Sequence, residues 1–268
     1  MASPRLTSSP WGFRFTPLAD QCRCLRDLGM HHICGQFFAE MAGMLPPDAP
    51  EAALATARDE VRRHGLRYAS FNATGDFMVE PAKVAGEVAA CCHQIDRAAL
   101  FQPEVIIVFA GWQERRDEAV YGQVAASLKQ VARHAARHGL TVALENHGGL
   151  TATVEQVNRI IGAVGEPNLG FNYDPANFAM YGQDPLDALR RLEVPVVFTH
   201  LKSLRSVNGK KEYCRLRDGE IDYLPILKLL AKTYTGFYAL EYEEAKDVEA
   251  GTRDDCETLA RWWTEIQG

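Results

Sequence analysis

Four residues that can bind a metal ion stand at the ends of short apolar runs in the second half of the chain: Glu145, Asp174, His200 and Glu241. The runs are rich in β-branched and aromatic residues, which is typical of buried strands. Helix-like segments separate them, and parallel strands joined by crossover helices all point the same way. We therefore expect the four side chains to meet on one face of a parallel sheet, where such folds keep their chemistry.

The chemistry of these residues depends on whether they act alone or together. A single Glu or Asp after a strand is usually a helix cap or a solvated loop residue, and a lone His usually belongs to the core or the surface. Three carboxylates in one mouth would repel one another, and some would hold protons unless a cation lies between them. Three oxygen ligands and one imidazole suit Mn²⁺, our first choice, or Mg²⁺ or Co²⁺, better than they suit structural zinc.

The four runs belong to a regular alternation of strands and helices. We predict strands at residues 11–15 or just before them, 31–34, 66–71, 105–109, 141–145, 169–174, 196–200 and 237–241. We predict helices at residues 17–28, 51–64, 81–100, 117–138, 153–164, from Asp184-Pro185 onward, 222–234 and 254–266. Thr153 and Asp184 are candidate N-caps, and residues 202–218 are predicted to form a long polar loop.

The number of units predicts the fold. Eight strands that alternate with about eight helices indicate a parallel α/β protein, and they favour a closed TIM (β/α)₈ barrel over an open doubly wound sheet. No composition break marks a second domain, so we expect one domain over residues 1–268. A glycine-rich phosphate loop after a strand is missing from the sequence, and His147-Gly-Gly149 is too short to be one.

Composition excludes several classes of protein. Hydrophobic residues make up 47% and charged residues 24%, which is ordinary for a globular protein. No apolar run approaches the roughly 20 residues that cross a bilayer, and the first residues lack a signal peptide's apolar core. The net charge of −6 disfavours a nucleic-acid partner. Seven cysteines without zinc-finger spacing are typical of a reduced, cytoplasmic protein.

Five segments carry a resemblance to a known family: Leu144-Glu-Asn-His-Gly148, Tyr173-Asp-Pro-Ala-Asn177, Thr199-His-Leu-Lys202, Gly219-Glu-Ile-Asp222 and Leu240-Glu-Tyr-Glu243. With these segments the chain resembles the xylose isomerase-like barrels, which include sugar isomerases and the D-tagatose and D-psicose 3-epimerases. The resemblance covers nearly the whole chain. It implies that Glu145, Asp174, His200 and Glu241 bind the metal, and that Glu145 and Glu241 double as the acid–base pair.

The chain also departs from the ketose epimerases. Asn177 stands where they usually carry a substrate-contacting histidine, three residues after the second ligand. Lys202 follows the histidine ligand by two positions, as in the broader isomerase-like and dehydratase members. Leu216-Arg-Asp218 precedes Gly219, where many relatives carry another glycine. These differences weaken an assignment to free-ketose 3-epimerisation and leave the metal site intact.

The cluster can support three related reactions. A metal on a ketone and its adjacent hydroxyl acidifies the neighbouring C–H, and a carboxylate can remove that proton to give an enediolate held by the metal. Returning the proton to the opposite face is epimerisation, and returning it to the next carbon is isomerisation. Loss of a β-substituent is elimination. We predict a metal-dependent sugar isomerase or epimerase; the alternative is a dehydratase or lyase that acts on a keto-inositol or a 3-keto sugar.

Flanking residues are candidates for binding the substrate. His147 lies two positions after Glu145 and could be an acid–base group or a substrate contact, or a loop histidine that caps a helix. Trp112, just after the fourth predicted strand, could stack on a sugar face or pack near the rim. Lys202 is expected to hydrogen-bond a substrate oxygen or to pair with a ligand carboxylate.

Polar residues on earlier strands and in the long loop complete the candidates. Asn72 and Gln36 end strands and could hydrogen-bond sugar hydroxyls, with loop capping as the alternative. Arg205 and Arg217 could bind a phosphate or a hydroxyl, with a solvated surface as the alternative for each.

Two other functions remain open by resemblance. Endonucleases for abasic DNA are relatives, but they use a trinuclear zinc site with extra histidines, where this chain offers Gln36 and Asn72. A sugar-binding barrel without activity is the other possibility, and the complete ligand set argues against it. We expect a small-molecule sugar or keto-polyol substrate, no membrane partner and a homo-oligomer, because relatives are often dimers or tetramers.

Overall fold

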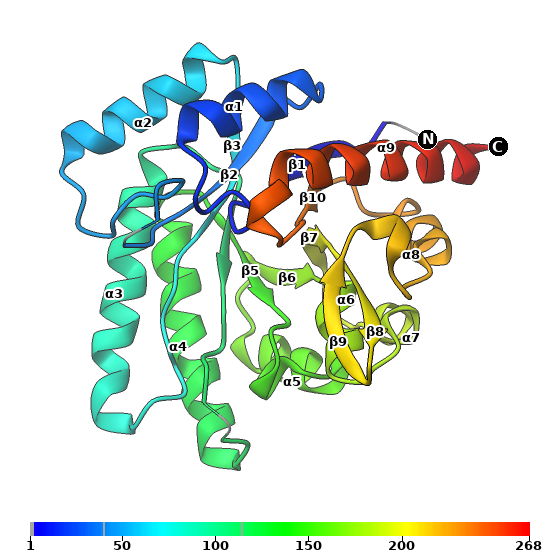
Figure 1. The fold of residues 1–268 in the computed structure, drawn as a ribbon. Helices are drawn as coiled ribbons and strands as arrows, with labels where there is room; N and C mark the ends of the chain where they lie inside the picture. Colours follow the sequence, from blue (N-terminus) through cyan, green and yellow to red (C-terminus); the bar gives the residue numbers. More distant parts are fainter. Residues whose placement is uncertain (1–2, 40, 114) are drawn as a thin grey trace.

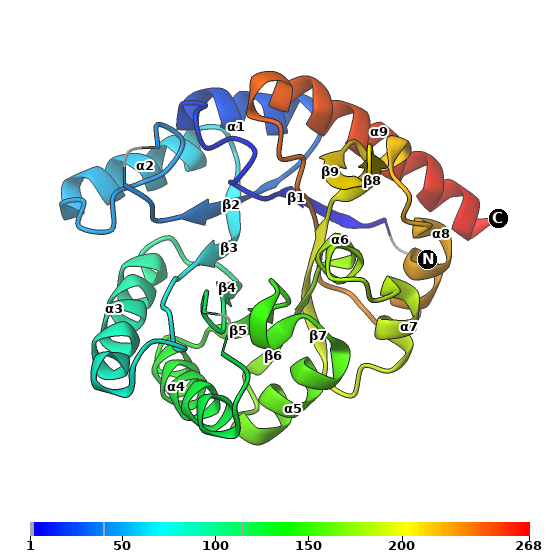
Figure 2. The same cartoon turned by 60° about the horizontal axis from the view of Figure 1, so that its bottom comes forward.

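The computed structural model describes residues 3–39, 41–113 and 115–268. Eight parallel strands form a nearly closed barrel in the order β1-β10-β7-β6-β5-β4-β3-β2, and the helices surround it (Figures 1 and 2). The strands are β1 (Arg5–Ser8), β2 (His32–Gln36), β3 (Arg67–Asn72), β4 (Val105–Val108), β5 (Thr141–Glu145), β6 (Leu169–Tyr173), β7 (Val196–Leu201) and β10 (Phe237–Leu240). The predicted TIM barrel is confirmed.

The helices mostly follow the predicted alternation. They are α1 (Leu18–Asp27), α2 (Glu51–Arg63), α3 (Pro81–Ala99), α4 (Glu118–Ala136), α5 (Val154–Val164), α6 (Pro175–Met180), α7 (Pro185–Arg190), α8 (Tyr223–Leu230) and α9 (Val248–Gln267). Thr153 caps α5 in a capping box with Gln156, and Asp184 caps α7, as predicted. The short helix α6 and the first turns of α9 were not predicted.

Alternation along the strands decides which side chains enter the barrel. Val105, Ile107 and Phe109 of the β4 run belong to the small apolar cluster inside the barrel, whereas Ile106 and Val108 face the helices. Ala143, Phe198 and Ala239 join the inner cluster from β5, β7 and β10. Because strand side chains alternate with a period of two, the next inward positions on these strands fall at the barrel mouth.

The barrel closes at a seam between its first two strands. β1 pairs with β10 and β2 pairs with β3, so β1 and β2 are the two edges of the sheet. Thr7 Oγ1 and Cys34 Sγ lie 3.5 Å apart across this seam. The eight strands, closed at this seam, carry the residues of the barrel mouth at their C-terminal ends.

The prediction of a long polar loop at residues 202–218 was wrong. Residues Ser203–Val207 (β8) and Lys210–Cys214 (β9) form an antiparallel hairpin, followed by a single 3₁₀ turn, η2 (Leu216–Asp218). Asn208 and Gly209 make its two-residue turn with φ of 51° and 77°, values that suit Asn-Gly in a hairpin. This Asn-Gly pair is the sequence signal that identifies the hairpin, and the many charged residues beside it obscured the strands.

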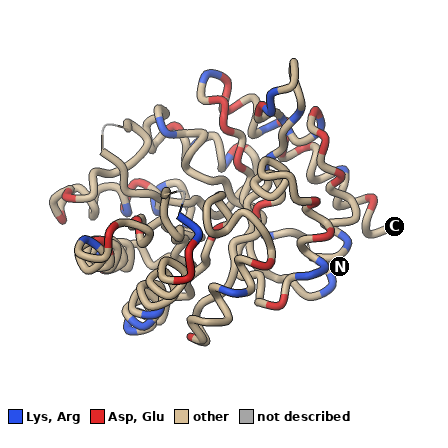
Figure 3. Tube along the Cα trace, turned by 90° about the horizontal axis from the view of Figure 1, so that it is seen from below, with Lys and Arg blue, Asp and Glu red and all other residues tan. Residues whose placement is uncertain are grey.

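Charged residues cover the outside of the barrel. In the view of Figure 3, acidic and basic residues are interspersed over the helices and loops. Within the described residues, no helix combines the length and the apolar character that a membrane span requires.

One buried carboxylate ties the hairpin region to the last helix. Asp255 on α9 is fully buried and accepts a hydrogen bond from the Leu216 N–H at 2.7 Å, while its Oδ2 has no partner. Burial raises its pKa to about 7, and the charge of Asp254 adds to this increase. The folded protein therefore holds a proton between about pH 4 and 7 that the unfolded chain has released, so the stability of the fold falls as pH rises through this window.

We expect Asp255→Asn to keep the hydrogen bond and remove the buried charge. Its free energy of unfolding should exceed that of the wild type by about 1–3 kcal/mol at pH 8, and the difference should shrink towards pH 5. Urea denaturation at the two pH values measures it. Glu257→Gln, an exposed change on the same helix, is the control. An Asn variant with a pH-independent effect would contradict the assignment.

Candidate metal centre and active site

The four predicted ligands meet at the barrel mouth, and three of them continue the inward-facing series of their strands. Glu145 follows Ala143 by two positions, His200 follows Phe198, and Glu241 follows Ala239. Asp174 comes directly after β6 and is the N-cap of α6. One ligand atom from each of the four lies within 4.8 Å of all the others, and all four side chains are buried.

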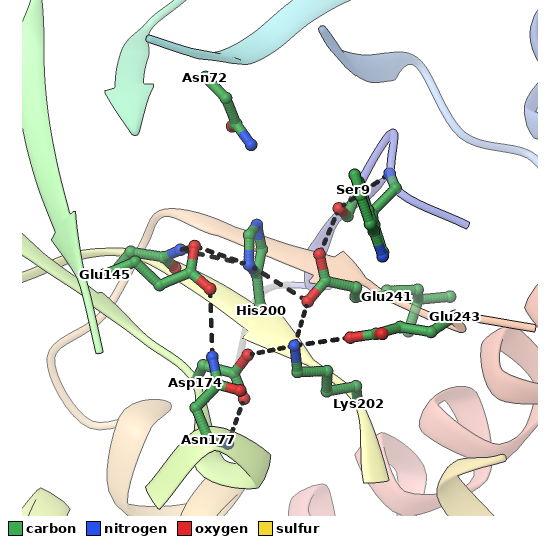
Figure 4. A network of polar contacts seen from close by, with 12 residues as sticks. Ser9, Asn72, Glu145, Asp174, Asn177, His200, Lys202, Glu241 and Glu243 are labelled. Atoms are coloured by element: carbon green, nitrogen blue, oxygen red, sulfur yellow. Dashed lines mark hydrogen bonds and ion pairs between the residues drawn. The ribbon is translucent and has the colours of Figure 1, made fainter. Parts of the chain in front are cut away.

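A lysine that the sequence placed in the site lies among these carboxylates. Lys202 Nζ is 3.2 Å from Asp174 Oδ2, 2.9 Å from Glu241 Oε2 and 2.8 Å from Glu243 Oε1 (Figure 4). Its side chain is only 3% exposed, so its charge is removed from water and compensated almost entirely by these three groups. Of the alternatives from sequence, the structure shows the pairing with ligand carboxylates.

Each carboxylate is held by neighbours that fix its orientation. Asn172 Nδ2 donates to Glu145 Oε2 at 2.9 Å, and Asn177 Nδ2 donates to Glu145 Oε1 at 3.2 Å. Ser9 Oγ donates to Glu241 Oε1 at 2.5 Å. The Asn177 N–H donates to Asp174 Oδ1 at 3.0 Å. The carboxylates of Glu145, Asp174 and Glu241 are therefore positioned before anything binds.

The electrostatics show how strongly the site attracts positive charge. Burial alone would lower the pKa of His200, but the charges of Glu241 and Glu145 outweigh it and raise the pKa to about 9. Burial likewise would raise the pKa of Glu241, but His200 and Lys202 hold it down to about 2. The pKa of Asp174 rises to about 7, because burial outweighs the attraction of Lys202.

The donor set fits a hard divalent cation. Asp174 Oδ2 and Glu241 Oε2 accept no hydrogen bond, although both lie in ion pairs with Lys202, and His200 Nδ1 faces Glu145 Oε2 at 3.3 Å and Glu241 Oε2 at 3.5 Å. At metal–oxygen distances of about 2.1 Å, adjacent ligands stand about 3 Å apart and opposite ligands about 4.2 Å apart, which is compatible with four ligand atoms that all lie within 4.8 Å of one another. Glu145, Asp174, His200 and Glu241 are the residues that would hold it.

A pocket of about 420 Å³ opens above this cluster. Its lining reaches Glu145, His200 and Glu241, whereas Asp174 lies beneath them and is fully buried. Gln36, Asn72, Thr74, His147, Lys202 and Glu243 supply further polar groups, and Trp11, Phe38, Phe109, Trp112 and Tyr213 supply aromatic walls. A polar floor beneath apolar walls is the usual composition of a small-molecule site.

The predicted substrate contacts are divided between the pocket and its surroundings. Trp112, His147, Lys202 and Asn72 line it, as does Gln36, which accepts a hydrogen bond from Asn72 Nδ2 at 3.3 Å. Asn177 is buried and contacts Glu145 instead of the pocket. Arg205 is exposed on β8 outside the pocket lining, and Arg217 pairs with Asp254.

Aromatic side chains form two parts of the pocket wall. Trp112 packs on Phe109 with ring centroids 5.0 Å apart, and both contact His147 edge-on at 5.5 Å. Trp11 packs on Phe38 at 6.2 Å. Trp112 is 49% exposed and Phe38 40%, so apolar ring surface faces the open mouth. This surface suits the C–H face of a sugar or another apolar group.

Several residues of the site were not predicted as such. Glu243 and Asn172 stand two positions from Glu241 and Asp174, so strand alternation is the signal that identifies them. Ser9, Trp11, Phe38 and Tyr213 come from loops and from the hairpin, where no periodic pattern marks them.

Comparison with known proteins identifies the family and the fold. The family model described as a xylose isomerase-like TIM barrel matches residues 24–262. The chain is 24% identical over 145 residues to the inosose dehydratase of Clostridium botulinum (strain Alaska E43 / Type E3); this match covers 48% of the chain and 49% of that enzyme, so the chain spans about half the length of this curated relative.

Solved structures share the whole fold. An L-ribulose 3-epimerase is similar with a TM-score of 0.82 and 16% identity, covering 99% of this chain and 96% of that one. A xylose isomerase-like TIM barrel protein from Mycobacterium smegmatis, solved in complex with magnesium, has a TM-score of 0.77 and 17% identity, with full coverage of both chains.

We expect Lys202→Met to destabilise the metal-free protein. The change leaves Asp174, Glu241 and Glu243 without their buried counter-charge, which costs about 3–5 kcal/mol. A divalent cation in the cluster should recover most of this loss. Thermal unfolding in EDTA and in saturating MnCl₂ measures both effects.

The control for this experiment is Lys210→Met, the same change at an exposed position of the hairpin. An equal loss for Lys202→Met with and without the metal would mean that lysine and cation do not serve the same carboxylates.

Proposed function

The chain belongs to the xylose isomerase-like TIM barrel family, and from this premise we propose that it is a divalent-metal-dependent sugar isomerase or epimerase. The proposed reaction is removal of a proton from the carbon next to a carbonyl and its return to the opposite face or to the neighbouring carbon. The proposed cation is Mn²⁺, with Mg²⁺ and Co²⁺ as alternatives, bound by Glu145, Asp174, His200 and Glu241.

The observation that carries this proposal is that two buried carboxylates line the same pocket. Glu145 and Glu241 both line the pocket, from strands that are separated in the barrel by β6 and β7. Two carboxylates on different sides of one bound substrate can exchange protons with it from different directions. Asp174, which lies beneath them, is left to hold the cation.

The surroundings of the two carboxylates suggest their roles. His200 and Lys202 keep the pKa of Glu241 low despite its burial, and Ser9 orients it, so Glu241 is ionised, the state in which a carboxylate can accept a proton. Glu145 is held by the amides of Asn172 and Asn177 and would deliver a proton from its own side. When bound, the metal would supply Lewis-acid polarisation of the carbonyl.

Residues around the pocket would position the sugar. We propose that Asn72 and Gln36 hydrogen-bond its hydroxyls and that His147 contacts it from the β5 side. We propose that Trp112 stacks on its apolar face, a role that the exposed ring at the mouth supports. Asn177 would act on the substrate through Glu145, which it contacts. Arg205 would need a substrate that extends beyond the pocket to the hairpin.

A second candidate is a metal-dependent dehydratase or lyase that eliminates a β-substituent from a keto-inositol or a 3-keto sugar. Lys202 favours it, because an ammonium group that lines the pocket can hydrogen-bond to a departing hydroxyl. The inosose dehydratase relative is consistent with this alternative. An endonuclease for abasic DNA has less support, because Gln36 and Asn72 stand where extra histidine ligands would be needed.

The test is a screen of ketoses, keto-inositols and 3-keto-glycosides with added Mn²⁺, followed by NMR in deuterated water. Incorporation of solvent deuterium at the carbon next to the carbonyl, with a product of unchanged formula, supports the isomerase or epimerase. An unsaturated product that absorbs in the ultraviolet supports the lyase. Binding without any turnover or exchange across the screen would contradict both.

We expect Glu241→Gln to lower kcat at least 10³-fold in saturating Mn²⁺, because an amide cannot accept the proton. Metal content is measured on the same samples, so that loss of the cation is separated from loss of the base. Glu244→Gln, an exposed neighbour, should leave kcat unchanged. Turnover near the wild-type level with metal bound would show that Glu241 has no role in proton transfer.

We expect Trp112→Ala to raise KM about tenfold for the substrate found in the screen, with a change in kcat of less than threefold. The reason is the loss of a stacking platform, which contributes about 1–1.5 kcal/mol. Steady-state kinetics measure both constants. Phe15→Ala, which removes an exposed ring outside the pocket lining, is the control, and an equal KM for both variants would contradict the contact.

The cellular compartment and the partners of the protein are also proposals. All seven cysteines are unpaired, which supports a reducing, cytoplasmic compartment. We propose a small-molecule sugar or keto-polyol as the only partner besides further copies of the chain in a homo-oligomer.

A further inference from the structure

A second group of metal-binding side chains lies on the outside of the barrel, away from the mouth. Figures 1 and 2 show α3 and α4 side by side. Asp96 of α3 hydrogen-bonds to His134 of α4 and to His138 just after it. The Nε2 atoms of His134 and His138 both lie 2.7 Å from the same oxygen, Asp96 Oδ1. We propose that these three residues form a transition-metal site, best suited to Zn²⁺, that links α3 to α4.

The spacing explains why two imidazoles converge on one carboxylate. His134 and His138 are four residues apart, so they lie on the same side of the helix one turn apart. Their rings are 5.7 Å apart between centroids. One potential ligand atom from each of the three residues lies within 4.8 Å of the others. A tetrahedral zinc ion with bonds of about 2.0–2.1 Å sets its ligands about 3.3 Å apart, so the cluster has to open by only about half an ångström.

The chemistry of this group differs from that of the barrel mouth. Two imidazoles and one carboxylate prefer Zn²⁺, Cu²⁺ or Ni²⁺, whereas the carboxylate-rich mouth prefers Mn²⁺ or Mg²⁺. Burial would raise the pKa of Asp96, but its hydrogen bonds to His138 and His134 lower it, so the carboxylate is ionised and ready to bind a cation. Asp96 is exposed and His134 is half-buried, which leaves a path for the ion.

A thiol on the same helix lies outside the cluster. Cys92 stands one helical turn before Asp96 on α3 and is half-buried, but it is not among the residues whose ligand atoms lie within 4.8 Å of one another. The fourth position of a tetrahedral ion is therefore left to water.

The place of the site in the fold suggests what it does. Asp96 and His134 lie in the last turns of α3 and α4, and helix C-termini in this barrel stand at the end opposite the mouth. The ion would cross-link two neighbouring helices whose sequences are 38 residues apart. It would therefore stabilise this part of the outer layer without contacting substrate, so this inference is independent of the proposed function.

The test is zinc binding by calorimetry and by hydrogen exchange, with 1 mM Mg²⁺ present throughout to occupy the mouth. We expect one zinc per chain that the double variant His134→Gln/His138→Gln binds at least 100-fold more weakly. Zinc should also slow amide exchange in the last turns of α3 and α4 of the wild type. His200→Gln should retain this zinc, because it changes only the mouth.

Two controls keep the outcome clear. His93→Gln removes an exposed imidazole from α3 outside the cluster and should bind zinc as the wild type does. Cys92→Ser removes a thiol from the same helix outside the cluster and should also bind zinc as the wild type does. Unchanged zinc binding in the folded double variant, or loss of the zinc in His200→Gln, would overturn the proposal.

Discussion

The mouth of this barrel depends on the need to neutralise buried negative charge. Glu145, Asp174 and Glu241 are all nearly inaccessible to water, and Glu243 adds a fourth carboxylate beside them. Like charges at such distances raise one another's pKa unless a cation lies between them. Here Lys202 and protonated His200 supply that charge. A divalent ion would also neutralise the carboxylates, and His200 would then bind it as a neutral imidazole. Lys202 and the ion are therefore two sources of the positive charge that these carboxylates require.

Rigid support limits how the carboxylates can respond. Glu145 is held by two amides, Asp174 by the first turn of α6 and Glu241 by Ser9. None of the three can turn away from the others without breaking a buried hydrogen bond, which costs about 1–3 kcal/mol. Repulsion is therefore relieved by bringing in a cation rather than by moving the ligands. This constraint explains why so many neutral donors of the site face carboxylates rather than the pocket.

The sequence allowed the barrel and the convergence of Glu145, Asp174, His200 and Glu241 to be predicted for the same reason. Buried strands repeat every two residues, so Phe198 inside the barrel places His200 at the mouth, and Ala239 does the same for Glu241. The same alternation predicts that Glu243 and Asn172 face the site. It predicts nothing for residues outside strands, where side chains do not alternate. Ser9 follows a strand of only four residues, and Asn177 lies in α6, a helix too short to show a pattern. The hairpin was missed because its strands face solvent and alternate little in polarity.

The residues proposed for the chemistry stand on strands or directly after them, whereas the residues that would contact the outer part of a substrate stand on loops and the hairpin. Glu145, Asp174, His200 and Glu241 stand on strands or in the first residue after them, where the register of the sheet fixes their positions. Trp11, Phe38, Trp112 and Tyr213, which line the outer part of the pocket, come from the loops and the hairpin. Loops vary without disturbing the barrel. If the proposed function holds, the aromatic walls of this chain, rather than the four clustered residues, should determine which sugar it accepts.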